Sequence, residues 1–272
     1  MKFIIDHDYH IHTNLSPCAN DPLQTPENIL RHAEEHRLKH ICLADHFWDA
    51  LVPTTCGRLS GTYRNNDYAR NSSVLPLPQG KNTVFHYGCE GEMDLGFVIG
   101  IAPETVKKHE FIVIPTTHLH IGMVAEQNLT LEQRAVLYVQ RLHALLDSDL
   151  PDGKVGFAHP TTCLIAMPDR GAYLKVLDMI PDGVFRALFQ KLERRRFGVE
   201  LNFDSDLREF SDPDLDRVLR PYRIAKECGC KFYLGSDAHT AKELAASLGK
   251  FESYVDALNL TEDDKFRPFE TL

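Results

Sequence analysis

The sequence predicts an α/β protein in which helices connect parallel strands. Short β-rich runs recur along the chain, and longer helical patterns separate them. This alternation is typical of parallel strands joined by crossover helices. The length of 272 residues suits a single domain of this class, spanning residues 1–272. The pattern itself does not distinguish an open doubly wound sheet from a closed barrel.

Seven strands are expected along the chain. They are predicted at Lys2–His12, His40–Asp45, Thr83–Glu90, Phe111–His118, Lys154–His159, Phe197–Asn202 and Lys231–Asp237. Seven parallel strands satisfy either of the two architectures.

Capping residues and apolar spacing predict the helices. Thr25 before Pro26 predicts an N-cap followed by a proline at the first helical position, and Asp212 before Pro213 repeats the pattern. The predicted helices are one that begins at Pro26, then Leu131–Leu146, Pro181–Arg196, Asp212–Cys228 and Thr240–Leu248, with a last short helix after Tyr254.

One irregular stretch follows the second predicted strand. Residues 47–82 are rich in Asn, Ser, Pro, Gly and Arg. A loop of this length inside a compact domain is usually a lid, a binding loop or a disordered segment. We expect a long loop here that covers the active site.

Composition limits the partners and the location of the protein. The net charge of −9 opposes sequence-independent binding to nucleic acid, which needs a positive field. No apolar run reaches the ~18 residues that a membrane helix needs, and Asp6 and Asp8 interrupt the short apolar start. These features predict a cytoplasmic protein with no membrane partner. Seven cysteines, an odd number, argue against a disulfide framework.

Histidine and carboxylate residues gather at the ends of all seven predicted strands. These strand ends contain His10 and His12, Asp45 and His46, Glu90 and Glu92, His118 and His120, His159, Glu200, and Asp237 and His239. In parallel α/β folds the carboxyl ends of the strands bind ligands. Residues i and i+2 of a strand point to the same side. Imidazole and carboxylate donors suit Zn, Mn and Fe, so the sequence predicts a multi-metal site.

The order of these motifs resembles that of the PHP (polymerase and histidinol phosphatase) superfamily, from Asp8 to about Lys250. The stretches that carry the resemblance are Asp8-Tyr9-His10-Ile11-His12-Thr13, Ala44-Asp45-His46, Gly88-Cys89-Glu90, His118, Ala158-His159-Pro160 and Gly235-Ser236-Asp237-Ala238-His239. The resemblance implies a distorted TIM-like (β/α)7 barrel with two or three divalent ions, Zn, Mn or Fe.

The resemblance also implies roles for individual residues. The implied metal ligands are His10, His12, His46, Glu90, His118, His159, Asp237 and His239. Glu90 and Asp237 are also the catalytic candidates, as metal-bridging or general acid–base groups. Many family members have a ninth ligand, Asp or His, soon after the first histidine pair. Cys18 lies near that place in this chain, and a thiolate can bind zinc.

Within the superfamily, one short stretch is similar to histidinol-phosphate phosphatases. Glu200-Leu201-Asn202, followed by Leu207-Arg208, is similar to their Glu-x-Asn…Leu-Arg motif. The similarity implies that Asn202 and Arg208 lie near the phosphate. Arg170, in the loop after the fifth predicted strand, is a further candidate for substrate binding.

These observations favour hydrolysis of a phosphomonoester of a small metabolite, as in the histidinol phosphatases, by a metal-bridging hydroxide. One alternative is a phosphodiesterase or nuclease that acts on oligonucleotides, although such an enzyme should have a basic groove. Another is amidohydrolase-type hydrolysis. Amidohydrolases usually place a metal-bridging Lys at the fourth strand end, where this chain has His118. A non-catalytic metal sensor would not need so full a ligand set.

Overall fold

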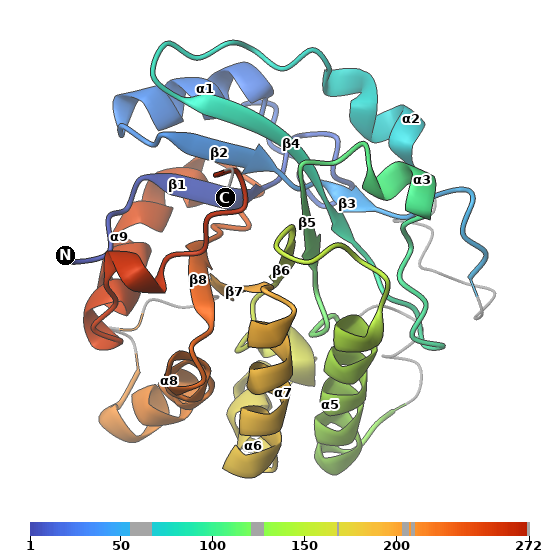
Figure 1. Cartoon of the computed structure of the whole chain (residues 1–272), viewed down its shortest axis with the longest axis vertical. Coiled ribbons are helices and arrows are strands. Elements are labelled where there is room, and N and C mark those ends of the chain that lie inside the picture. Colours follow the sequence, from blue (N-terminus) through green and yellow to red (C-terminus); the bar gives the residue numbers. More distant parts are fainter. Residues whose placement is uncertain (55–66, 121–127, 168, 203–206, 208–209, 271–272) are drawn as a thin grey trace.

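The computed structural model describes residues 1–54, 67–120, 128–167, 169–202, 207 and 210–270 (Figure 1). Its strands are β1 (His7–Ile11), β2 (His40–Leu43), β3 (His46–Phe47), β4 (Val84–Gly91), β5 (Phe111–Ile114), β6 (Val155–Phe157), β7 (Gly198–Leu201) and β8 (Lys231–Leu234). All strand pairs are parallel, in the order β1-β2-β4-β5-β6-β7-β8, and β3 pairs with β4 beside this path. The seven predicted strands are therefore present, with the two-residue β3 in addition.

The two outer strands of this order meet and nearly close a barrel. Ile11 forms a parallel bridge with Ala238, in the loop that follows β8, and the backbone N–H of His12 donates to the Ala238 carbonyl. The backbone N–H of Asp237 donates to the carbonyl of His10 at 2.7 Å. The fold is thus a distorted TIM-like barrel, as predicted.

Helices surround this ring (Figure 1). They are α1 (Pro26–Glu35), α2 (Tyr68–Asn71), α3 (Pro103–Val106), α5 (Leu131–Asp147), α6 (Tyr173–Asp178), α7 (Asp182–Arg194), α8 (Asp212–Glu227) and α9 (Ala241–Ala257). Short 3-10 turns occur at Ser72–Val74, Cys163–Ala166, Arg170–Ala172 and Glu262–Asp264. Thr25 caps α1 by accepting from the backbone N–H of Asn28, with Pro26 in the first turn, as predicted. None of the described helices combines the length and apolar character needed to cross a bilayer.

Several boundaries differ from the prediction. The strand expected at Phe111–His118 ends at Ile114, because Pro115 has no N–H to continue the ladder. The helix expected to end at Leu248 continues to Ala257, since Phe251 and Tyr254 extend its buried face. The N-cap of α8 is Ser211, one residue before the predicted Asp212.

Two further differences lie near the N-terminus and within the long loop. The first strand begins at His7 rather than at Lys2, which forms only an isolated bridge with Thr261. Within 47–82, residues 55–66 lie outside the described residues. The described part includes α2, where the Asn71 side chain donates to the His46 carbonyl at 3.0 Å. The covering role of this loop stays a prediction.

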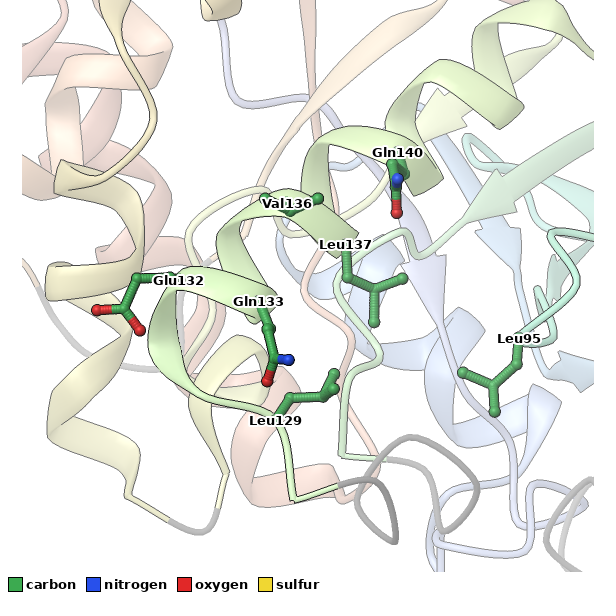
Figure 2. A pocket seen from close by; sticks show the side chains of 7 residues that line it. All are labelled: Leu95, Leu129, Glu132, Gln133, Val136, Leu137 and Gln140. Atoms are coloured by element: carbon green, nitrogen blue, oxygen red, sulfur yellow. The ribbon is translucent and has the colours of Figure 1, made fainter.

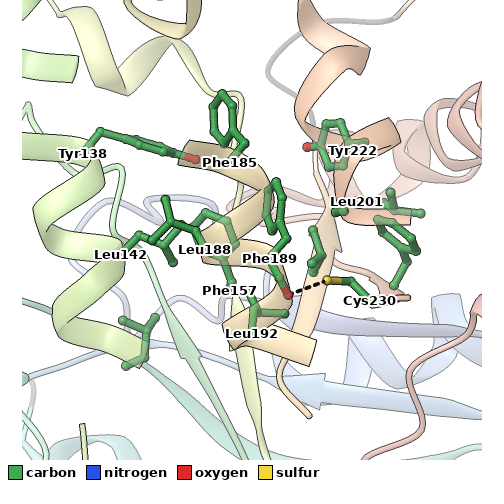
Figure 3. Close-up of a cluster of buried hydrophobic side chains, with 14 of the residues drawn as sticks. Tyr138, Leu142, Phe157, Phe185, Leu188, Phe189, Leu192, Leu201, Tyr222 and Cys230 are labelled. Carbon is green, nitrogen blue, oxygen red and sulfur yellow. Dashed lines mark hydrogen bonds between the residues drawn. The ribbon is translucent and has the colours of Figure 1, made fainter. Parts of the chain in front are cut away.

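A large apolar core holds the outer helices against the strands. Figure 3 shows rings from α5, α7 and α8 meeting side chains of β6 and β7, among them Tyr138, Phe157, Phe185, Phe189 and Tyr222. Each of these is essentially inaccessible to solvent. Burying one such side chain contributes roughly 1.5–3 kcal/mol, so this core fixes the positions of the strand ends.

Candidate metal centre

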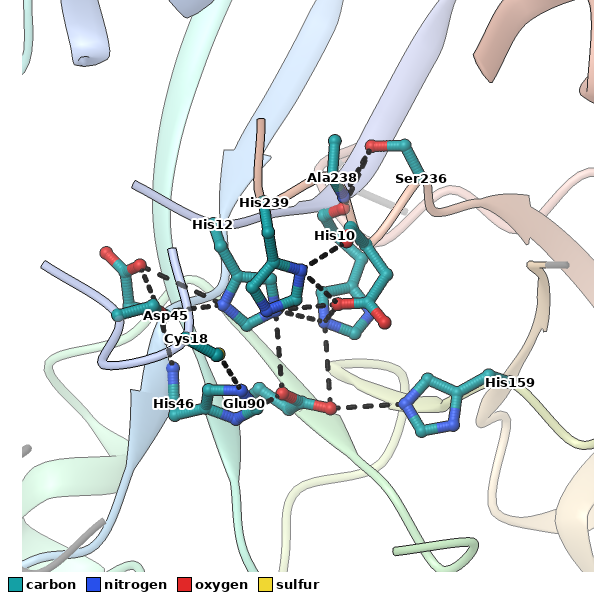
Figure 4. Close-up of polar contacts among 12 residues, drawn as sticks. His10, His12, Cys18, Asp45, His46, Glu90, His159, Ser236, Ala238 and His239 are labelled. Atoms are coloured by element: carbon teal, nitrogen blue, oxygen red, sulfur yellow. Dashed lines mark hydrogen bonds and ion pairs between the residues drawn. The ribbon is translucent and has the colours of Figure 1, made fainter. Parts of the chain in front are cut away.

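The carboxyl ends of the strands bring all eight predicted metal ligands to one side of the barrel. Figure 4 labels His10, His12, His46, Glu90, His159 and His239 among them. Four lie in strands or directly beyond them, namely His10, His12, His46 and Glu90, and four lie in the loops after β5, β6 and β8, namely His118, His159, Asp237 and His239. Their donor atoms form overlapping groups within 4.8 Å. The groups are His12–His46–His239, His10–His12–Glu90–Asp237, Glu90–His118–His159 and His46–Glu90–Glu92.

Glu90 lies at the centre of this cluster and is fully buried. Its Oε2 lies 2.7 Å from Nδ1 of His46, and its Oε1 lies 3.2 Å from Nε2 of His159. Burial alone would raise the pKa of Glu90, but the surrounding histidines, His46 and His118 foremost, hold it well below its usual range. Glu90 is therefore an anion that several imidazole groups share.

Hydrogen bonds hold the imidazole rings of β1 by their Nδ1 atoms. His10 Nδ1 donates to Glu200 Oε1 at 2.7 Å, and His12 Nδ1 donates to Ser16 Oγ at 2.8 Å. Ser16 in turn donates to Asp45. A hydrogen bond at Nδ1 fixes the tautomer and leaves the Nε2 lone pair for a metal.

The same arrangement recurs on the loops after β5, β6 and β8. His159 Nδ1 lies 2.6 Å from Thr117 Oγ1, and His118 Nδ1 donates to the carboxylate of Glu92 at 3.0 Å. His239 Nδ1 donates to the backbone carbonyl of Asp237 at 2.7 Å. These rings too are oriented before any ion binds.

The donor set fits divalent cations. The Nε2 atoms of His10 and His12 lie 3.1 Å apart, and the Asp237 carboxylate lies 2.8 Å from the latter. Two imidazoles on one tetrahedral zinc would place their nitrogens roughly 3.3 Å apart, given Zn–N bonds of about 2.0–2.1 Å. With their Nδ1 protons engaged elsewhere, both Nε2 atoms present lone pairs, which a cation between them would satisfy.

Two ligand positions adopt strained backbone conformations. His159 has φ of 28° and Asp237 has φ of 53°, a region that residues other than glycine rarely enter. Such strain costs about 1–3 kcal/mol per residue and clusters at functional sites. Burial would raise the pKa of Asp237, but His10 and His239 lower it below its usual range, so this side chain too is anionic.

Sequence reasoning missed the groups that orient the ligands. Glu200 was assigned to the phosphatase-like stretch, yet its carboxylate holds His10 and accepts the backbone N–H of His159 at 2.7 Å. Its place at a strand end was the available signal. Ser16 and Thr117 gave no signal, because small hydroxyl residues are common in loops.

A hollow of about 510 Å³ opens beside the cluster. Its lining includes Cys18, His46, His118, His120, Leu164, Asn202, Ser236, Asp237 and His239, together with Glu243, Ser247, Lys250 and Phe251 of α9. The predicted substrate residue Asn202 is buried here, and its Nδ2 has no hydrogen-bond partner among the described residues. Arg208 and the side chain of Arg170 lie outside the described residues, so their roles stay predictions.

A second hollow, of about 480 Å³, lies on the outer side of the barrel (Figure 2). Leu95, Leu129, Val136 and Leu137 line it with Glu132, Gln133 and Gln140. Among the described residues, this lining has one carboxylate and no imidazole or thiol. Of these two hollows, the one beside the cluster is lined by imidazole, thiol and carboxylate groups.

Comparisons with known proteins support the barrel fold. No protein-family model and no curated protein sequence matches the chain. The crystal structure of histidinol phosphate phosphatase from Lactococcus lactis, complexed with zinc, L-histidinol and phosphate, is similar with a TM-score of 0.63 and 17% identity over 94% of each chain. A candidate histidinol phosphatase from Listeria monocytogenes gives a TM-score of 0.54 and 14% identity, over 87% of this chain and 96% of its own. At these identities the likeness shows the fold, and the fold is the one that the motifs implied.

Proposed function

We propose that the protein is a metal-dependent phosphatase that hydrolyses a phosphomonoester of a small metabolite, with histidinol phosphate as the first candidate. The observation that carries the proposal is the convergence of six histidines and three carboxylates beside a hollow of about 510 Å³. The structurally similar Lactococcus protein, solved with zinc, L-histidinol and phosphate, supports the same choice.

The chain provides two inner metal positions that share Glu90. One is formed by His10, His12 and Asp237, and the other by His118 and His159. Divalent ions held there, Zn, Mn or Fe, would stabilise negative charge on phosphoryl oxygens and lower the pKa of water. Glu90 and Asp237 balance the charge of the ions, and the bonds at Nδ1 keep the imidazoles in place.

The wall of the hollow would bind the substrate at its phosphoryl group and at its leaving group. Asn202 Nδ2 is a buried hydrogen-bond donor that has no acceptor among the described residues, and we assign it to a phosphoryl oxygen of the substrate. Burial lowers the pKa of His120 to about 4, so this rim residue is neutral and can exchange hydrogen bonds with a polar leaving group. Among the described residues of the lining, Lys250 is the one basic residue other than histidine, whereas an oligonucleotide site needs a basic groove. This favours a small monoester.

The test is phosphate release from a panel of phosphomonoesters, histidinol phosphate included, by protein loaded separately with Mn, Zn or Fe(II). We expect strong turnover of one small monoester, and little degradation of single-stranded DNA or of an amide panel. An Asn202→Ala variant should raise KM more than it lowers kcat. Metal-loaded protein that is silent on every monoester, or that degrades DNA faster, would refute the proposal.

A further inference from the structure

A cysteine lies at the rim of the metal centre, within reach of two of the predicted ligands. Cys18 lies on the loop between β1 and α1, and its Sγ is 3.2 Å from Nε2 of His46 (Figure 4). It also hydrogen-bonds with His239. Cys18 is exposed and lines the hollow beside the cluster.

The donor group at this rim differs from the inner groups. His12, His46 and His239 bring their donor atoms within 4.8 Å of one another, and this group contains no carboxylate, whereas each of the other three contains Glu90. The Nδ1 atoms of His46 and His239 are engaged with Glu90 and with the Asp237 carbonyl. On His46 the nitrogen that faces the thiol is Nε2, and His239 also hydrogen-bonds with Cys18.

We propose that Cys18 is a thiolate ligand of an outer metal position that it forms with His46 and His239. The proposal rests on the proposed metal-dependent function and specifies the chemistry of one part of that site. Binding replaces the S–H bond by a sulfur–metal bond, and the thiol proton passes to solvent. The thiolate supplies the negative charge that this position otherwise lacks.

The distances agree with a shared ion. Zn–S bonds of about 2.3 Å and Zn–N bonds of about 2.0–2.1 Å at a tetrahedral angle place sulfur and nitrogen roughly 3.6 Å apart. The observed 3.2 Å between Cys18 and His46 needs a shift of a few tenths of an ångström. Cys18 is on a loop at the protein surface, so this shift disturbs no core packing.

The donor types predict different ions at the inner and outer positions. Thiolate ligands favour zinc, whereas carboxylate-rich positions also accept manganese. The outer position should therefore keep zinc or cobalt(II) when the inner ones exchange with manganese. Among the other cysteines in the described part of the chain, Cys42, Cys89, Cys163 and Cys230 are buried, and Cys228 contacts the Arg186 carbonyl away from the centre.

The decisive experiment is cobalt(II) substitution of the full-length protein, read by absorption spectroscopy. A cobalt–thiolate bond gives an intense sulfur-to-metal charge-transfer band in the near ultraviolet, which imidazole and carboxylate ligands do not give. We expect the band in the wild type and in Cys228→Ser, the matched control, and its loss in Cys18→Ser. Cys18→Asp should also lose the band but keep more metal than Cys18→Ser, because it retains an anionic donor.

Two further readouts make the test complete. Loss of an outer-sphere partner already weakens metal binding about 10–100-fold, so Cys18→Ser should bind the outer ion at least tenfold more weakly. Zinc should also protect Cys18, and not Cys228, from alkylation, as mapped by peptide mass spectrometry. Circular dichroism checks that each variant is folded.

The outcomes separate this inference from the proposed function. A wild-type protein that binds cobalt and hydrolyses a monoester without the band, or a Cys18→Ser variant that keeps the band, would overturn the role of Cys18 and leave the phosphatase proposal standing. A wild-type protein that shows the band and binds the expected ions but is silent on every monoester would refute the phosphatase proposal alone.

Discussion

The two ends of the barrel both carry histidines, but they use them differently. At the carboxyl ends of the strands, six imidazoles have Nδ1 engaged and gather around Glu90 and Asp237. At the opposite end, His7 of β1, His40 of β2 and His86 of β4 lie near one another in the sheet register. A histidine at a strand end is therefore not by itself a sign of metal binding.

At that opposite end, neighbouring protein groups occupy the ring nitrogens. His86 Nδ1 donates to Glu110 at 2.8 Å, its Nε2 lies 3.1 Å from His40 Nδ1, and its ring stacks on Phe269 with centroids 3.5 Å apart. His7 Nε2 accepts the backbone N–H of Leu234 at 3.0 Å. The candidate metal centre differs in one respect. Its imidazole rings are held by a hydrogen bond at one nitrogen, and their other nitrogens meet at buried carboxylates that several rings share.

The sharpest test of this contrast removes one side chain at each end. His10→Ala or Asp237→Ala should lose bound metal and nearly all phosphatase activity, a larger effect than the 10–100-fold that an outer-sphere change typically costs. His86→Ala should keep both. Metal content and phosphate release are measured on proteins shown to be folded. Full metal content and turnover in His10→Ala and Asp237→Ala would overturn the site assignment.

A smaller effect is expected from the carboxylates that hold the histidines. Both oxygens of Glu200 accept hydrogen bonds, from His10 and from the backbone of His159, and Gln could satisfy only one of them. We expect Glu200→Gln to weaken metal binding about 10–100-fold. Glu110→Gln changes the equivalent partner of His86 and is the matched control, with unchanged affinity in a metal-competition titration. Equal effects of the two substitutions would remove the distinction between the ends.

The smallest effect concerns stability alone and involves His7. Burial lowers the pKa of His7 to about 4, against about 6.5 in an unfolded chain. Between these values the unfolded chain binds more protons, so stability falls as the pH drops from about 6.5 towards 4. At pH 5 the loss is about 2 kcal/mol relative to pH 7.5.

Urea unfolding at pH 7.5 and pH 5 measures this loss. His7→Gln should unfold with a smaller difference between the two pH values, whereas the exposed control His143→Gln should keep the wild-type difference. An unchanged difference in His7→Gln would show that His7 is not the titrating group.

The sequence predicted the ligands better than their surroundings. The pairs His10/His12 and Asp237/His239 are visible because strand alternation puts i and i+2 on the same side. The bond between His10 and Glu200 joins residues 190 positions apart, and only the closed ring brings them together. Periodicity predicted α9 but not its length, because its last turns depend on burial of Phe251 against the barrel core.

The seam between β1 and β8 has a consequence for how the protein matures. His10 and His12 leave the ribosome early, whereas Asp237 and His239 follow more than 220 residues later. A growing chain therefore carries His10 and His12 together with His46 and Glu90 well before Asp237 and His239 complete the groups that they share. Ions that bind only the closed ring would stabilise it by mass action, so a metal bound at these residues would favour the pairing of β1 with β8. Protein depleted of that metal would then have first and last strands that separate more readily.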